Sequence, residues 1–540
     1  MNDMSDTTLT GRRERPVPAP ATRGPATDPV ARLRPVIAGA VGALAGIGLS
    51  ELVAGFLGAP SLLAAIGGFV IDNQPPGAKD LVVSLFGTND KLALETLIVA
   101  VAAVVGAGLG IVAVRASFAL AAVGFGVFAV AGFFASLRMP DATSTTAMIV
   151  AIVAAVVGAQ TMSLLLRAGG VARTQTGAPA ATVMADWSRR GFLLQAAGVA
   201  VASTAAGLIG RRLIEGGGTQ AAAPAIPGAA VTATLPAGAE LAVEGLTPLV
   251  VPSDRFYRID TALIVPSVDA ASWQLRIHGM VDREVTLSYA ELAQMPLFEQ
   301  YVTIACVSNE VGGNLVGNAK WTGVKLREVL AMAGVQAGAT QLVGRSVDGF
   351  TAGMPTEWVM DPSREPMIAL KMNDAPLPKN HGYPARLIVP GLYGYVSATK
   401  WLVDLELTTL EAFDGFWIPR GWAKEAPILT QARIDVPGSG QSVPAGRVAI
   451  AGVAWAPDRG VSRVEVAIDG AWRDAQLSAP ISKTTWVQWL YAWDAAASGA
   501  GDHTIEVRAT DGTGQVQTTD RTPPAPDGAR GHQTIQVRVG

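Results

Sequence analysis

Among its 540 residues the sequence has only one cysteine, Cys306. A single thiol excludes an intramolecular disulfide, and an exposed free thiol outside the cytoplasm would be open to oxidation. Lone cysteines often serve as small buried apolar groups. Cys306 is therefore either a packed core residue or a ligand or nucleophile, and the residues around it bear on that choice.

Charged residues are also few, at 16% of the chain, and the formal net charge is -3. A nucleic-acid-binding protein would carry a basic excess, so we expect no nucleic-acid partner. Half of the residues are hydrophobic, and the chain is too long for one core. Three or four domains are expected from this length.

Hydrophobic residues gather between positions 36 and 214, in segments long enough to cross a membrane. The five segments are 36–57, 97–114, 118–137, 147–166 and 192–209. They are rich in Ala and Gly, which lets membrane helices pack closely. A further stretch, 62–71, is too short to span and is expected to lie along the membrane surface. The sequence thus predicts a transmembrane region over 36–214, after a disordered cytoplasmic tail at 1–35.

Arginines flank these segments unevenly. They occur in the tail and at Arg115, Arg167, Arg173, Arg189 and Arg190, whereas the loop at 59–91 is mainly acidic. By the positive-inside rule the N-terminus is predicted to be cytoplasmic, and five crossings place the chain after Arg212 outside. Arg138, Arg211 and Arg212 run against this pattern.

None of the four histidines lies between residues 36 and 214. Because b-type haem normally needs histidine ligands, we expect no haem in this region. Glu51, inside the first segment, is either a functional proton or ion site or a carboxylate that reaches the membrane interface.

Residues 188–194 read SRRGFLL and stand directly before the fifth segment. This run resembles a twin-arginine export signal, which serves proteins that fold around a cofactor before they cross the membrane. The alternative is that Arg189 and Arg190 are ordinary cytoplasmic flanking charges.

The rest of the chain has the composition of soluble domains. Residues 215–250 are rich in Gly, Ala and Pro and are predicted to be a linker. Residues 251–425 alternate short apolar strands with helical pieces, which predicts a mixed α+β domain. Residues 426–540 show alternating strands separated by Asp-Gly turns, the pattern of an immunoglobulin-like β-sandwich. Its tryptophans, Trp486, Trp489 and Trp493, are expected in a core or interface.

Five short elements of the soluble part occur in a characteristic order. CVSN at 306–309 is followed by GNAKWTGVKL at 317–326, PLP at 376–378, HGYPAR at 381–386 and KW at 400–401. Together they resemble the sulfite oxidase family of molybdenum enzymes, from about residue 254 to the C-terminus. The resemblance implies an α+β molybdopterin-binding domain followed by a sandwich like the family's dimerisation domain, and hence a possible homodimer.

In this family one cysteine thiolate binds molybdenum beside the two dithiolene sulfurs of a pterin, and the resemblance gives that role to Cys306. A soft thiolate suits a high-valent metal in a sulfur-rich shell. The phosphate of the pterin needs cations and donors, which Arg386, His381 and Lys400 can supply. The resemblance implies further cofactor contacts at Asp254, Tyr257, Arg258, Ser346 and Ser397. Taken alone, each of these could equally be a satisfied structural polar group.

Several departures from the family pattern concern the substrate. Sulfite-oxidising members carry an arginine shortly after the cysteine, where this chain has EVGG at 310–313. The family's active-site tyrosine corresponds to Trp422, and Arg459 either matches an anion-binding arginine or is a surface residue. The loop from Gly391 to Lys400 is one residue longer than in most relatives, which leaves the role of Ser397 open.

These features predict a membrane-anchored molybdenum-pterin oxidoreductase that transfers an oxygen atom on a small substrate outside the cytoplasm. Because we find no cytochrome domain in the sequence, its electrons are expected to pass to or from a separate cytochrome or quinone-linked carrier. Without the post-cysteine arginine, sulfite is expected to be a poor substrate, and removal of oxygen from a sulfoxide-like group is at least as favoured as oxidation. The alternative is a non-catalytic, membrane-anchored binding or adhesion protein that works through its immunoglobulin-like domain.

Overall fold

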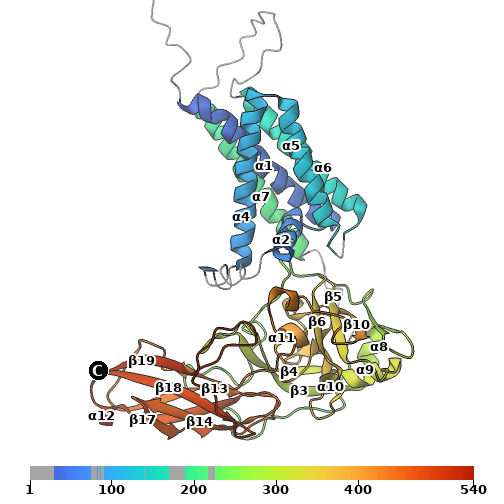
Figure 1. Cartoon of the computed structure of the whole chain (residues 1–540). Coiled ribbons are helices and arrows are strands. Elements are labelled where there is room, and N and C mark those ends of the chain that lie inside the picture. The colour runs from blue at the N-terminus through green and yellow to red at the C-terminus, as the bar shows by residue number, and fades with distance from the viewer. Residues whose placement is uncertain are drawn as a thin grey trace, which may run out of the picture.

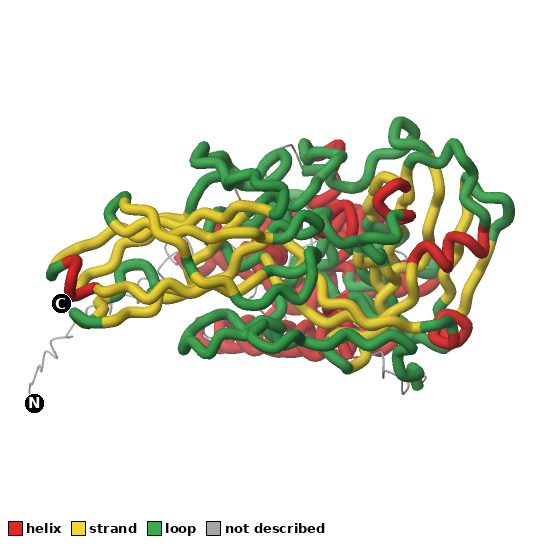
Figure 2. Tube along the Cα trace, turned by 90° about the horizontal axis from the view of Figure 1, so that it is seen from below, coloured by secondary structure: helices red, strands yellow, loops and turns green. Residues whose placement is uncertain are grey.

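The computed structural model describes residues 29–74, 82, 85–86, 90–139, 142–168, 189–216 and 225–540. These residues form a helical bundle, an α+β domain beneath it and a β-sandwich at one side (Figure 1). Seen from below, the strands of the sandwich project sideways from the α+β domain and carry the C-terminus (Figure 2). The predicted fold class, a membrane-type helical region followed by an α+β domain and an immunoglobulin-like sandwich, is confirmed.

Long apolar helices make up the bundle. Its elements are α1 (Pro29–Leu57), α2 (Leu62–Asp72), α4 (Asp90–Arg115), α5 (Phe118–Ser136), α6 (Ser144–Ala168) and α7 (Arg189–Gly216). Within the described residues, five helices are long and apolar enough to cross a membrane, and α2 is too short. The five predicted segments are therefore confirmed as helices, and α1 packs against α4, α6 and α7.

Glycine lets the backbones of α1 and α4 touch. A Cβ atom built on Gly39 of α1 would lie 2.0 Å from the carbonyl oxygen of Gly106, and one on Gly106 would lie 2.5 Å from the carbonyl oxygen of Gly39. Neither position admits a side chain without separating the helices. This is the close packing that the small residues of the segments predict.

The start of α1 corrects one prediction. The helix begins at Pro29, so residues 29–35 are helical and do not belong to a disordered tail. Proline suits the first position of a helix because its missing N–H would have no helical partner there. The rest of the predicted tail, residues 1–28, and Ser188 of the twin-arginine run lie outside the described residues.

Glu51 has a structural partner. It is buried in the last turns of α1, where its Oε1 accepts hydrogen bonds from Ser61 Oγ at 2.9 Å and from the amide of Leu63 at 3.0 Å. Both donors stand at the N-terminus of α2, where unpaired amides favour a carboxylate. Glu51 therefore fixes α2 against the end of α1 that faces the α+β domain (Figure 1).

The soluble domains and the arginine-flanked helix ends lie at opposite ends of the bundle. α1, α5 and α7 run toward the α+β domain, and α4 and α6 run away from it (Figure 1). Arg115 and Arg167 end α4 and α6 at the far side. Arg211, one of the residues that break the charge pattern, is paired at the near side with Glu95 at 3.0 Å and Glu215 at 2.6 Å.

Two sheets build the α+β domain, in the orders β2-β1-β10-β5-β6 and β3-β4-β7-β8, with β9 paired to β7. The strands are β1 (Gln274–Gly279), β2 (Val285–Ser288), β3 (Leu297–Ala305), β4 (Val316–Lys325), β5 (Gln341–Ser346), β6 (Thr351–Pro355), β7 (Met367–Met372), β8 (Ala375–Pro376), β9 (Arg386–Ile388) and β10 (Leu402–Thr408). Short helices connect them: α8 (Tyr289–Gln294), α9 (Leu326–Ala333), α10 (Thr356–Met360) and α11 (Gly394–Ser397).

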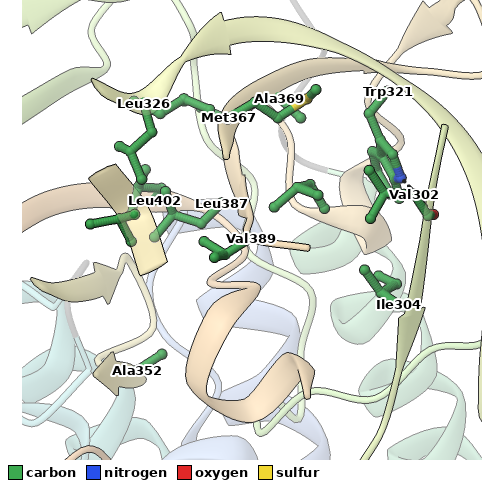
Figure 3. Packing of buried hydrophobic residues seen from close by; sticks show 14 of the residues in the cluster. Val302, Ile304, Trp321, Leu326, Ala352, Met367, Ala369, Leu387, Val389 and Leu402 are labelled. Atoms are coloured by element: carbon green, nitrogen blue, oxygen red, sulfur yellow. Dashed lines mark hydrogen bonds between the residues drawn. The ribbon is translucent and has the colours of Figure 1, made fainter. Parts of the chain in front are cut away.

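The core of this domain contains Val302, Ile304, Trp321, Met367 and Leu387, which pack together with their side chains excluded from solvent (Figure 3). Most positions of β3 and β7 are buried, because both faces of these strands are covered. The two strands are therefore a rigid base for the loops at their ends.

The sandwich consists of sheets β11-β13-β17-β16 and β12-β19-β18-β14-β15. Its elements are β11 (Gln431–Val436), β12 (Ser442–Val443), β13 (Arg447–Trp455), β14 (Val461–Ile468), β15 (Ala471–Asp474), β16 (Gln476–Leu477), β17 (Val487–Asp494), α12 (Ala495–Ser498), β18 (Gly501–Asp511) and β19 (Gln533–Val539). Trp489 and Trp493 are buried in its core, as predicted, and Trp486 is buried against the α+β domain.

The sandwich docks directly onto β3. The amide of Thr303 donates to the carbonyl of Thr484 at 2.9 Å, and the amide of Trp486 donates to Thr303 Oγ1 at 2.8 Å. Thr484 Oγ1 also donates to the carbonyl of Tyr301 at 3.1 Å. The loop before β17 thus extends the hydrogen bonding of the strand that leads to Cys306.

The predicted linker is a packed segment over its described part, residues 225–250. Val231 pairs with Phe298 of β3, and Gln488 of the sandwich bonds to the backbone of Leu241 and Thr247 at 2.7 Å each. The carbonyl of Leu249 accepts from the indole of Trp486 at 2.9 Å. A composition rich in Gly, Ala and Pro is compatible with a flexible linker and also with an extended segment that hydrogen-bonds to neighbouring domains. Composition alone therefore did not predict the packing of this segment.

Candidate functional site

A cavity opens in the α+β domain where residues 256–261, the end of β3 and the segment around α11 meet. Among the site residues predicted from sequence, those that line it are Tyr257, Cys306, Ser346, Arg386, Lys400 and Trp422. They come from segments far apart in the chain, so the fold gathers them at one place. We call this the catalytic cavity.

Cys306 follows directly after β3. Its amide donates to the carbonyl of Leu315 at 2.9 Å, and its carbonyl accepts from the amide of Asn309 at 3.0 Å. Asn309 Oδ1 in turn accepts from the amide of Leu315 at 2.8 Å. Cys306 is 8% exposed and lines the cavity together with Val307, whereas its other neighbour, Ala305, belongs to the core. The geometry favours a ligand over a packing residue.

Arg386 and Lys400 bring two buried cations to the cavity. Arg386 opens β9, its Nη1 donates to the carbonyl of His381 at 3.0 Å, and its Nε is buried without a hydrogen-bond partner. Burial lowers the pKa of Arg386 to about 10. Burial and the nearby charge of Arg386 lower the pKa of Lys400 to about 8, although the carboxylate of Asp260 acts to raise it. Two cations held this close together out of water are a site for an anion.

His381 is buried beside them, in a 3-10 turn at Lys379–His381. Its Nε2 lies 2.8 Å from the carbonyl of Ser253, so Nε2 carries the proton. Nδ1 has no partner, and burial with the charge of Arg386 lowers the pKa of His381 to about 4. The ring is neutral near pH 7, and Nδ1 becomes a donor only when an anion raises that pKa.

Asp260 is the site residue that the sequence did not reveal. Its carboxylate, 4% exposed, meets Lys400 at 3.0 Å, Arg258 at 2.9 Å and Lys91 at 2.5 Å. Burial acts to raise its pKa, but Lys400 and Lys91 hold the pKa of Asp260 well below its usual range. Lys91 belongs to α4, so this carboxylate joins Lys400 and Arg258 to a helix of the bundle. No sequence signal links residues 169 positions apart.

Aromatic side chains form much of the remaining wall. Trp422 packs on Tyr395 with ring centroids 6.0 Å apart, and Tyr395 donates to the carbonyl of Ala423. Tyr257 is half-buried, desolvation raises its pKa, and the nearby Cys306 raises it further. The cavity therefore holds the phenol groups of Tyr257 and Tyr395 beside Trp422. Neither tyrosine stands at position 422, to which the sequence comparison assigned the family's tyrosine.

Other predicted site residues do not line the cavity. Asp254 is exposed, and Arg258 reaches the site only through Asp260. Ser397 Oγ lies 3.0 Å from the carbonyls of Leu392 and Tyr393, to which it can donate.

Arg459 belongs to the base of the sandwich. Its Nε donates to Asp511 at 2.8 Å, and its Nη2 donates to the carbonyl of Ile428 at 3.0 Å and to Thr430 Oγ1 at 3.1 Å. These hydrogen bonds indicate a structural role for Arg459 in the sandwich, and its position does not indicate a catalytic role.

The donor set fits a phosphorylated pterin. Arg386 has no ion-pair partner among the described residues, Lys400 is paired with Asp260, Arg386 Nε and His381 Nδ1 are buried without partners among the described residues, and Cys306 offers one sulfur. The free space is about 90 Å³, below the ~300 Å³ usual for cofactor pockets. Side chains must therefore move on binding, and the carboxylate of Asp260 stands where it competes with a phosphate for Lys400.

Comparison with known proteins agrees with this chemistry. Residues 262–417 match the oxidoreductase molybdopterin binding domain family, and residues 431–507 match a bacterial Ig domain. The α+β region is thus a sulfite oxidase-like molybdopterin-dependent oxidoreductase domain, and the cofactor of this domain is a molybdenum-pterin. The match favours the oxidoreductase over the non-catalytic alternative.

Individual relatives match only part of the chain. The mitochondrial sulfite oxidase of Homo sapiens is 30% identical over 295 residues, which cover 46% of this chain and 54% of that protein. The sulfite oxidase of Gallus gallus is 27% identical over 342 residues, covering 54% and 74%. The sulfane dehydrogenase SoxCD of Paracoccus pantotrophus is a solved structure with 23% identity and a TM-score of 0.46, covering 55% of this chain and 82% of that one. The chain spans about half the length of the first curated relatives it matches.

Proposed function

We propose that this chain is a membrane-anchored molybdenum-pterin oxidoreductase that transfers an oxygen atom to or from a small substrate outside the cytoplasm. It exchanges two electrons with a separate carrier. The observation that carries the proposal is the Cys306 thiol at the wall of a cavity that also holds the buried cations Arg386 and Lys400.

Each side chain has a role in this proposal. Cys306 holds the metal, and Arg386 and Lys400 hold the phosphate, with His381 joining them once an anion raises its pKa. Ser346 lines the same wall and offers a hydroxyl. When bound, the molybdenum-pterin group supplies the oxygen-atom and two-electron chemistry.

The wall of the cavity bears on the substrate. Residues 310–313, which replace the family's post-cysteine arginine, do not line the cavity, and the carbonyl of Gly313 instead accepts from Arg433 at 3.0 Å. With Arg386 and Lys400 assigned to the cofactor, the lining that remains is mainly aromatic and aliphatic and includes the carboxyl groups of Asp260 and Asp348. It favours an uncharged, sulfoxide-like substrate over the sulfite anion, because an unpaired anion is costly away from water.

The helix arrangement supports an outer location for this site. Arg115 and Arg167 stand at the end of the bundle away from the soluble domains, and the positive-inside rule assigns that end to the cytoplasm. The catalytic cavity then lies outside, with the sandwich as the candidate surface for a homodimer.

Metal analysis of the purified full chain tests the proposal. The wild type, expressed with molybdate, is expected to hold about one molybdenum per chain, and Cys306→Ser is expected to lose it because no other thiolate is available. A thermal melt of the variant without cofactor serves as the folding control. Equal molybdenum in the two proteins contradicts the assignment of Cys306, and a turnover of sulfite that exceeds that of sulfoxides contradicts the proposed substrate preference.

A further inference from the structure

A second cavity, of about 880 Å³, lies between the helical bundle and the α+β domain. One wall comes from the end of α1, from α2 and from the last turns of α5 and α7, and the other from residues 261–269 and 347–350. Volumes of this size are typical of sites for small organic ligands. We call this the junction cavity.

Exposed aromatic side chains of the bundle line the junction cavity. Phe56 of α1 and Phe69 of α2 line it and are 72% and 44% exposed. Phe56 belongs to the last turn of α1, and Phe69 belongs to α2, which lies at the end of the bundle next to the soluble domain (Figure 1). Large exposed aromatic groups at that end of the bundle favour a ligand that arrives through lipid rather than through water.

The two cavities share a wall. Thr261, Asp348 and Phe350 line both of them. The Phe350 ring lies 5.7 Å from that of Phe416, which lines the junction cavity, and Phe416 lies 5.0 Å from Trp417, which lines the catalytic cavity. A ligand in the junction cavity is therefore separated from the catalytic cavity by single side chains.

Polar groups in the junction cavity suit a ring with carbonyl oxygens. Arg138 and Lys379 line it and bring N–H donors, and the Arg138 guanidinium lies 5.0 Å from the centre of the Phe69 ring. On the shared wall, the half-buried carboxyl of Asp348 accepts from the amide of Phe350 at 3.1 Å. Burial raises the pKa of Asp348, so the carboxyl is suited to take up and release a proton.

We infer that the junction cavity binds a quinone, with its ring against the shared wall and its apolar tail along α2. This inference rests on the proposed function, since it names the class and place of the separate electron carrier. The balance is complete: a substrate that gains an oxygen atom from water releases two electrons and two protons, and the quinone takes up both to become the quinol. In the opposite direction the quinol supplies the two electrons and two protons that turn a sulfoxide oxygen into water.

A glycine provides the test. Gly68 of α2 lines the junction cavity, and a Cβ atom there would meet nothing within 4 Å, so Gly68→Phe fills the space without displacing the backbone. Gly126 of α5 also has open space around its Cβ position but does not line the cavity, which makes Gly126→Phe the matched control. Binding of a radiolabelled decyl-benzoquinone to the full chain in detergent is measured by equilibrium dialysis.

The wild type and Gly126→Phe are expected to bind one quinone per chain, and Gly68→Phe is expected to bind at least tenfold more weakly. A photoreactive azido-quinone is expected to label α2 or residues 261–269. Equal binding by all three proteins, or labelling confined to other segments, overturns the inference. Turnover with a soluble dye is measured in parallel, because its absence in all three proteins contradicts the proposed function while leaving the binding result to stand.

Discussion

Replacing Asp260 by asparagine tests whether this carboxylate occupies the place of a phosphate. The side chain keeps its size, but Lys400, Lys91 and Arg258 lose the one anion they share, at 3.0, 2.5 and 2.9 Å. Removing one partner of a buried ion pair costs about 3–5 kcal/mol. Lys91 and Arg258 are partly exposed, so we expect a loss near the lower limit, about 3 kcal/mol.

The assay is a thermal melt of the cofactor-free full chain, with sulfate as an anion whose charge does not change with pH. A loss of about 3 kcal/mol lowers the melting temperature by about 6–12 °C for a domain of this size. Sulfate at about 100 times its dissociation constant returns about 2.7 kcal/mol, so it should nearly restore Asp260→Asn. In the wild type sulfate has to compete with Asp260, and its effect should be smaller.

Asp435→Asn is the matched control. Asp435 is as well buried and pairs with Arg433 at 2.6 Å, but both belong to the sandwich. This variant should also lose stability, and sulfate should raise its melting temperature only by the smaller increment expected for the wild type. If sulfate stabilises Asp260→Asn no more than the wild type, Asp260 does not compete for the cations and the reasoning is refuted.

Three other predictions follow from the site and the topology. The affinity of the cofactor-free chain for sulfate, measured by titration calorimetry, should fall as the pH rises through about 8. The pKa of Lys400 is lowered to about 8, and above it the ammonium that attracts the anion is lost. Lys400→Gln should remove this pH dependence, and an unchanged profile in that variant contradicts the assignment. Arg459→Gln should destabilise the sandwich by about 3 kcal/mol, because it leaves the buried Asp511 carboxylate without its cation. The molybdenum content should stay unchanged. A loss of molybdenum in the folded variant would instead support a role of Arg459 at the site. Replacing Arg189 and Arg190 by lysine should keep a reporter fused after Gly540 in the cytoplasm, while an outer reporter at normal levels shows that the run is not an export signal.

The long apolar helices and several residues that line the catalytic cavity could be predicted from the sequence. Helices that cross a membrane need a minimum length of apolar residues, and that length is readable without tertiary information. Cys306, Arg386 and Lys400 were found because each lies in a short motif whose local turn or strand fixes the side chain. Tyr257, Ser346 and Trp422, which line the same cavity, were assigned from the resemblance that the order of these motifs supports.

The remaining features depend on contacts between distant residues. Asp260 acquires its role from Lys91 and Lys400, which lie far from it along the chain in opposite directions. Ser397 was assigned to the site by the family resemblance, but its hydroxyl faces carbonyls of its own turn. A motif identifies the residue types near a site, whereas the partner of each polar group is set by packing.

The docking of the sandwich on β3 determines how these two domains can be separated. Thr303 in the middle of β3 bonds to Thr484 and Trp486, so cutting the chain before the sandwich would leave buried hydrogen-bonding groups unpaired next to the strand that ends at Cys306. Residues 225–250 bind both domains and close the same interface from the other side. The immunoglobulin-like domain is therefore not a detachable module, and the two domains should unfold in a single cooperative transition.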